Sequence, residues 1–231
     1  MKTSKILFIT LISLGAIYII AAMIEVRITG KKPGEFSTTL KSNKKELGSF
    51  SVLVLNSSRN IRLVESETNY LEVLVPDDSP SAEINYSLSG DTLRINNPQT
   101  SELSIVFATL HAAKGLKTIY LEDSDLQILK FSSENLSLLL NNSKARFVIN
   151  KSDYPTIGSL QITAFNKSTV DLNTVNIDTI GILLQNSSAR MQIPTKLIKG
   201  ELSENSELNA QQPSEISVKR DSTSKMTFYN R

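Results

Sequence analysis

Apolar and polar residues alternate in a pattern that recurs five times in the second half of the chain. Each copy begins with alternating apolar residues, breaks at a short cluster of Asn, Ser, Asp or Lys, and then resumes the alternation. The copies start at Leu136, Leu160, Ile180, Ile198 and Ile216, which are 24, 20, 18 and 18 residues apart. A weaker sixth copy starts 20 residues earlier, at Leu116. Strand-type alternation with a period near 20 residues is typical of a solenoid, so the pattern predicts parallel coils stacked one on another.

The alternation also predicts which side chains face the interior of the stack. Inward residues of one coil should lie on those of the next, with neighbouring strands about 4.8 Å apart. The predicted inward residues are Leu138, Leu140, Phe147 and Ile149, followed by Ile162, Leu172, Ile182, Leu184, Met191 and Ile193. The polar clusters are suited to corners, because Asn, Asp and Ser tolerate left-handed backbone. Alignment of the copies predicts a polar ladder along one edge, made of Ser143, Asn166, Asn186 and Asn205.

Shorter strand patterns fill the first half of the chain. The candidate strands begin at Phe50, Asn60, Leu71, Ala82, Thr92 and Ser101. Gly90, within Ser-Gly-Asp, separates two of them and predicts a β-hairpin. The segment from His111 to Gly115 is expected to be a helical turn or a loop. A sandwich or a barrel would also satisfy these strands, but the near-constant repeat favours an all-β solenoid.

The amino terminus carries an uncharged apolar segment of 19 residues, from Ile6 to Ile24. As a helix it would be roughly 28 Å long, about the hydrocarbon thickness of a bilayer. Lys2 and Lys5 also fit the basic start of a cleaved signal peptide, the alternative interpretation. We expect a membrane anchor over residues 1–27, a polar linker over 28–48 and a β-solenoid domain over 49–231. Basic residues flank the segment almost equally, and the short leading tail favours a cytoplasmic amino terminus with the domain outside the cytoplasm.

The strand and turn segments together resemble a bacterial family, the auto-transporter adhesin head domains, also called GIN domains. The resemblance covers roughly Phe50 to Asn230 and depends on FSVLVLNSSRNIRLVESETNYLEVLV, AEINYSLSGDTLRINN and the run from LKTIYLEDSDLQIL onward. The family usually has Gly-Ser-Gly type corners, whereas this chain has Asn-Asn-Ser, Asn-Lys-Ser, Asn-Ser-Ser and Asp-Ser-Thr. The resemblance implies a right-handed β-solenoid-like domain in a membrane-anchored or exported protein, common in Bacteroidetes-type bacteria. It assigns no functional residue.

The net charge and the reactive side chains limit the kinds of binding and catalysis that the chain can support. A net charge of +2 with scattered Lys and Arg gives no basic patch for nucleic acid. The absence of cysteine excludes disulfides and thiolate metal sites. His111 is the single histidine and is expected to have a structural or surface role.

Two sets of carboxylates are candidate sites. Glu122, Asp123 and Asp125 form the densest acidic group, for which a solvated turn is favoured over a calcium site. Asp171 and Asp178 show no partner in register for glycan hydrolysis or elimination. We therefore expect no enzyme activity, no catalytic, cofactor-binding or metal site and no cofactor.

The expected role is that of a single-pass membrane protein whose extracytoplasmic solenoid binds or scaffolds envelope polymers or proteins. Rows of Ser, Thr and Asn on a regular surface can meet a glycan or a peptide strand. The alternatives are an accessory structural or signalling module of an envelope membrane complex, and a glycan-active β-helix enzyme. Residues Phe50 to Leu110 are expected to cap one end, and the carboxyl end, TFYNR, lacks polar cover, which favours self-association.

Overall fold

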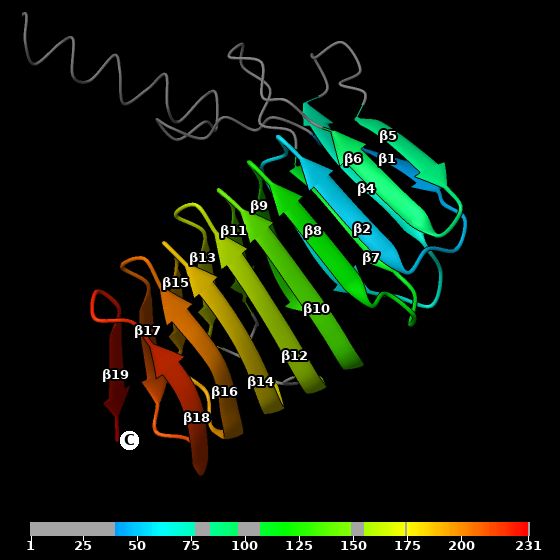
Figure 1. The fold of residues 1–231 in the computed structure, drawn as a ribbon. Helices are drawn as coiled ribbons and strands as arrows, with labels where there is room; N and C mark the ends of the chain where they lie inside the picture. Colours follow the sequence, from blue (N-terminus) through cyan, green and yellow to red (C-terminus); the bar gives the residue numbers. More distant parts are fainter. Residues whose placement is uncertain (1–39, 77–83, 97–106, 149–154, 174, 231) are drawn as a thin grey trace, which may run out of the picture. The chain divides into compact units, whose positions relative to one another are not determined.

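The computed structural model describes residues 40–76, 84–96, 107–148, 155–173 and 175–230. The chain from Leu40 onward forms a compact unit of its own. Its described residues contain nineteen strands in two sheets (Figure 1). In spatial order the ten-stranded sheet consists of β1 (Leu40–Glu46), β4 (Tyr70–Pro76), β7 (Phe107–Ala112), β3 (Ile61–Glu65), β9 (Asp125–Lys130), β11 (Lys144–Phe147), β13 (Thr169–Leu172), β15 (Ser188–Met191), β17 (Glu207–Gln211) and β19 (Lys225–Tyr229). The nine-stranded sheet consists of β18 (Glu215–Arg220), β16 (Thr195–Ser203), β14 (Asn176–Gln185), β12 (Thr156–Phe165), β10 (Ser133–Asn141), β8 (Thr118–Glu122), β2 (Val52–Asn56), β6 (Thr92–Asn96) and β5 (Asn85–Ser89).

From β8 onward each coil places one strand in each sheet, and neighbouring coils pair in parallel. The strand register of the nine-stranded sheet follows the alignment of the sequence copies. Leu136 pairs with Leu160, and the pairing continues through Ile180, Ile198 and Ile216. The predicted parallel coils are therefore confirmed. The weaker copy is one residue out of register, because Leu138 pairs with Ile119, 19 residues earlier.

The inward side chains form columns, as the alternation predicts. One column joins Leu140, Ala164, Leu184 and Leu202, and another, in the opposite sheet, joins Phe147, Leu172, Met191 and Ala210. All of these side chains are almost completely buried. Ile149, which belongs to the predicted set, lies outside the described residues. Large and small side chains thus occupy the same column in different coils and fill the space between the sheets.

A ladder of buried serines runs along one edge of the stack. It consists of Ser58, Ser124, Ser143, Ser168, Ser187, Ser206 and Ser224. The backbone N–H of each of the first six serines donates to the Oγ of the serine in the next coil, with N···O distances of 2.9–3.3 Å. The hydroxyls of the first six donate to a carbonyl two or three residues earlier. This serine ladder satisfies backbone groups that the corners would otherwise leave buried and unpaired.

The last serine of the ladder is held by a carboxylate. Asp221 Oδ1 accepts from the N–H of Ser224 at 2.8 Å, and Asp221 Oδ2 accepts from the N–H of Glu204 at 2.8 Å. These hydrogen bonds, with Ser224 as the largest contributor, hold the pKa of Asp221 well below its usual range. Asp221 therefore ends the serine ladder in its ionised form.

The predicted Asn ladder is displaced from this one by one or two residues. The asparagines occupy the left-handed corner positions, with φ of 48° at Asn142, 54° at Asn166, 49° at Asn186 and 62° at Asn205. Each precedes a serine of the ladder by one or two residues. Ser143 hence belongs with the buried serines, and Asn142 is the true counterpart of the three other asparagines. The physical reason is that only the hydroxyl is short enough to lie inside the corner and bond both neighbours.

The first coil lies inside the stack and is covered by strands that come later in the sequence. β2 pairs with β6 on one side and β8 on the other, and β3 lies in the same way between β7 and β9. Beyond β6 and β7 the pairing becomes antiparallel, with β5 on β6, β4 on β7 and β1 on β4. The β5–β6 hairpin confirms the turn predicted at Gly90, whose φ is 59°. The strands of these antiparallel pairs, β1, β4, β5, β6 and β7, are called the cap below.

Two predicted segments differ from the structure. The sequence predicts a polar linker over 28–48, yet residues 40–46 form β1, whose side chains at 41–46 are all exposed. An edge strand that buries no side chain needs no apolar alternation, which explains the missing signal. The segment His111–Gly115, predicted as a turn or loop, begins with the last two residues of β7.

The predicted anchor, Ile6 to Ile24, lies outside the described residues. Within residues 40–230, where described, no helix has the length and apolar character needed to cross a membrane.

Candidate binding face

One outward column of the nine-stranded sheet is largely apolar across five neighbouring coils. Val54 pairs with Tyr120, which pairs with Leu139, and the column continues through Thr163 and Leu183. Their neighbours along each strand are mostly buried, so these five side chains face outward. Tyr120 is 42% exposed and Leu183 37%, and the other three are half-buried. This apolar stripe extends about 19 Å at the usual strand spacing.

Polar columns flank the apolar stripe on both sides. One consists of Asn56, Glu122, Asn141, Phe165 and Gln185, and the other of Val52, Thr118, Ser137, Gln161 and Gly181. Amide and hydroxyl groups predominate in both columns. The face therefore offers hydrogen-bonding groups at regular intervals on either side of an apolar centre, with an exposed tyrosine ring among them.

A groove adjoins one flanking column at the starts of β10 and β12. Its volume is about 980 Å³, and it is lined by Lys114, Gly115, Leu116, Lys117, Ser132, Ser133, Glu134, Asn135, Leu136, Ser137, Thr156, Gly158, Ser159 and Gln161. Ser137 and Gln161 belong to both the groove and the flanking column, so groove and apolar stripe are continuous. Together they form what we call the binding face. Hydroxyls and amides give the groove a capacity for many neutral hydrogen bonds, and Lys114, Lys117 and Glu134 add charged ones.

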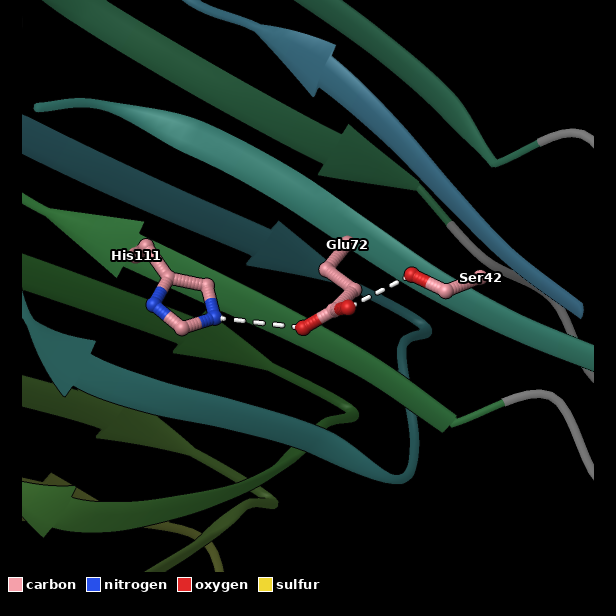
Figure 2. Close-up of polar contacts among 3 residues, drawn as sticks. All are labelled: Ser42, Glu72 and His111. Atoms are coloured by element: carbon pink, nitrogen blue, oxygen red, sulfur yellow. Dashed lines mark hydrogen bonds and ion pairs between the residues drawn. The ribbon is translucent and has the colours of Figure 1, made fainter.

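His111 lies on the opposite sheet, in a polar cluster of the cap (Figure 2). Ser42 Oγ on β1 donates to Glu72 Oε1 on β4 at 2.5 Å. Glu72 Oε2 lies 3.5 Å from His111 Nε2 on β7, and the imidazole stacks on Tyr70 with ring centroids 4.0 Å apart. The hydrogen bond from Ser42, followed by Lys44 and His111, lowers the pKa of Glu72 against the opposing effect of burial.

This cluster does not have the order of a Ser-His-acid triad. Such a triad needs the imidazole between the hydroxyl and the carboxylate, where it can take the hydroxyl proton. Here the carboxylate of Glu72 lies between Ser42 and His111 (Figure 2). The contacts join β1, β4 and β7, so their evident effect is to hold the cap strands together.

The acidic residues considered from the sequence are distributed over separate contacts. Asp171 lies 3.6 Å from Arg146 Nε, and Asp178 lies 3.0 Å from Lys196 Nζ. The sequence interpretation that both lack a partner in register is therefore wrong, since each pairs with a base on the neighbouring coil. Asp123 Oδ1 accepts a hydrogen bond from the side-chain Nδ2 of Asn142 at 2.6 Å. Within the described residues, no group of three or more His, Asp or Glu side chains is placed to hold a metal ion.

Sequence reasoning missed the apolar stripe. The sequence predicts rows of Ser, Thr and Asn on the outer surface, whereas Tyr120, Leu139 and Leu183 share one outward column. The signal was present in the aligned copies, where Leu139 and Leu183 occupy the same position between two inward residues. It appears only when the outward positions are compared from coil to coil.

The fold is that of several solved bacterial structures. One, described as a "putative adhesin" from Bacteroides fragilis, matches with a TM-score of 0.54 and 11% identity over 84% of this chain and 98% of its own. A second "putative adhesin", from Parabacteroides distasonis, matches with a TM-score of 0.55 and 11% identity over 84% and 95%. A third, from the same species and described as a "putative lipid binding protein", gives 0.54 and 10% over 84% and 98%.

No protein-family model matches the chain. No curated protein matches it either. At these identities the solved structures show a shared all-β, two-sheet, mostly parallel architecture. Their different descriptions on one fold mean that a ligand must be argued from the surface of this chain.

Proposed function

We propose that the chain is a non-catalytic binding or scaffolding protein of the bacterial envelope, related to the GIN domain family. In this proposal the segment from Ile6 to Ile24 is an uncleaved anchor, and the solenoid, wound right-handed, lies outside the cytoplasm. The shared fold with solved structures described as adhesins supports the class of protein. The parallel strand register supports the solenoid architecture.

The binding face carries the proposal. A long polymer presents a repeating series of groups, and parallel coils present matching groups at strand intervals. The groove supplies hydroxyl and amide partners, while Tyr120 and Leu183 offer apolar surface for the flat face of a sugar ring or an apolar side chain. An extended glycan or peptide strand of the envelope fits this combination. A compact small molecule would use only a fraction of it.

The direct test is binding of the full-length protein to purified peptidoglycan, envelope glycans and envelope proteins. Tyr120→Ala and Leu183→Ser should each weaken binding about tenfold, the loss expected when one exposed apolar contact is removed. Val148→Ser is the matched control, because Val148 is 40% exposed but follows β11 of the other sheet. Equal binding by all three variants, or no retention on any of these materials, would contradict the proposed binding face.

The location is tested separately. We expect residues after Lys32 to be digested by a protease added outside the cytoplasmic membrane, in cells whose outer barrier has been opened. The protein should sediment with membranes and remain there after a high-salt wash. Release of a shortened chain into the soluble fraction would instead support the cleaved signal peptide.

A further inference from the structure

The nine-stranded sheet ends at β18, which within the described residues pairs with β16 alone. The N–H of Asp221 donates to the carbonyl of Leu202 on β16 at 3.1 Å. Backbone groups alternate in direction along a strand, so the N–H and C=O groups of Ile216 and Val218 point to the open side. The edge of β18 is therefore able to accept another strand.

The charged side chains of β18 are of both signs, so this edge can meet a strand of complementary charge. Natural sheets protect an open edge with charged side chains, lysine above all, and β1, an end strand of the other sheet, carries Lys41, Lys44 and Lys45 beside Glu46. β18 carries one acid, Glu215, and two basic residues, Lys219 and Arg220, all of them exposed. Ile216 is 40% exposed although it continues an inward column.

We propose that β18 pairs antiparallel with β18 of a second copy of this chain, about a twofold axis at Ser217. In this register Glu215 faces the partner's Lys219, and the partner's Glu215 faces Lys219. Ile216 faces the partner's Val218, and both belong to the groups whose backbone points to the open side. Two charge pairs, two apolar pairs and the backbone bonds then form together.

The neighbouring registers are less favourable. A slip of one residue would set a backbone group that points to the open side against one that points to β16, so only even shifts pair. Centring on Val218 would place Glu215 against the partner's Asp221 and Ile216 against the partner's Arg220. Centring on Ile216 would place Glu215 against the partner's Ser217 and Lys219 against the partner's Pro213, so neither charge would meet an opposite charge.

Because the chain has no cysteine, one introduced thiol tests the axis directly. Ser217 would face its own copy in a non-hydrogen-bonded pair with Cα atoms about 4.5 Å apart, within the range for a disulfide. Full-length Ser217→Cys protein should therefore form a covalent dimer rapidly under mild oxidation. Lys199→Cys is the control, since Lys199 is exposed beside Ser217 on β16 but lies away from the edge.

Charge reversal tests the register. Glu215→Lys and Lys219→Glu, each combined with Ser217→Cys, should each lower cross-linking about tenfold or more, because each places like charges opposite one another twice. An equal mixture of the two variants should restore cross-linking, and the product should contain one chain of each kind. Equal cross-linking by Ser217→Cys and Lys199→Cys, or no recovery in the mixture, would overturn the proposal. Unchanged circular dichroism spectra would show that all variants fold.

Discussion

Replacing Ser168 with alanine tests the serine ladder at its centre. Ser168 is fully buried, and its Oγ accepts from the N–H of Ser143 at 3.1 Å and donates to the carbonyl of Phe165 at 2.6 Å. The carbonyl of Phe165 also accepts from the N–H of Asn142 and of Ser168, so it keeps partners in the variant. The N–H of Ser143 loses its acceptor and stays buried.

The expected loss of stability follows from this difference between the Ser143 N–H, which loses its acceptor, and the Phe165 carbonyl, which keeps other partners. A buried donor left without a partner costs about 1–3 kcal/mol, and the lost hydroxyl bond to the Phe165 carbonyl adds roughly 1 kcal/mol. We therefore expect Ser168→Ala to lower the free energy of unfolding by about 2–4 kcal/mol. Ser222→Ala is the control, because Ser222 is an exposed corner residue and its change should stay within about 0.5 kcal/mol.

Urea unfolding followed by circular dichroism on residues 40–231 measures the difference, provided that the slope with urea is the same for both variants. Hydrogen exchange adds a local readout, since the Ser143 amide should exchange faster in Ser168→Ala relative to amides two coils away. If Ser168→Ala unfolds at the same urea concentration as Ser222→Ala, or if the Ser143 amide keeps its protection, the serine ladder does not stabilise the stack as argued.

Three further outcomes are expected. Gly200→Ala should lower the free energy of unfolding in urea by about 2 kcal/mol or more, because φ is 143° and the new Cβ would clash with the carbonyl oxygen of Ile182. Gly181→Ala, whose Cβ meets only a flexible glutamine end, should cost less than about 1 kcal/mol, and equal losses would refute the strain argument. The pKa of Asp221 is lowered, so its stabilisation is present above its unfolded pKa of about 3.9 and fades as the pH falls below it. Asp221→Asn should remove that part of the acid dependence and be less stable at pH 7, as measured by melting at pH 7 and pH 3. The pKa of Glu72 is also lowered, so the stability that its carboxylate contributes is present above its unfolded pKa of about 4.5 and fades as the pH falls below it. Glu72→Gln should be less stable at pH 7 and should lose that part of the acid dependence. An unchanged pH profile would contradict this argument.

The register of the later coils could be predicted because each coil repeats a large aliphatic residue at one inward position. A slip of one residue would turn every inward side chain outward, so the positions of Leu136, Leu160 and Ile180 fix the pairing. The corners were less determined. Asn142 and Ser143 are adjacent and both suit a turn, and only the backbone angle and the buried hydrogen bond distinguish their roles.

The cap and the binding face escaped prediction for different reasons. β1 pairs through its backbone with exposed side chains on both faces, so it leaves no hydrophobic period in the sequence. The contact of His111 with Glu72 joins strands that are distant in sequence and antiparallel, outside the repeat. The apolar stripe depends on outward positions, which a search for core residues passes over.

The strands that pair with the first coil come much later in the sequence, and this has a consequence for the order of folding. Contacts between later coils close loops of 18 to 25 residues, as Ser206 with Ser224 and Ser143 with Ser168 show. The contact between Ser58 and Ser124 closes a loop of 66 residues. The longer loop costs about 1 kcal/mol more in chain entropy than one of 19 residues, before any of its pairing is gained. Nucleation should therefore begin among the carboxyl-terminal coils, which can grow one after another, and the amino-terminal strands should close onto a stack that already exists.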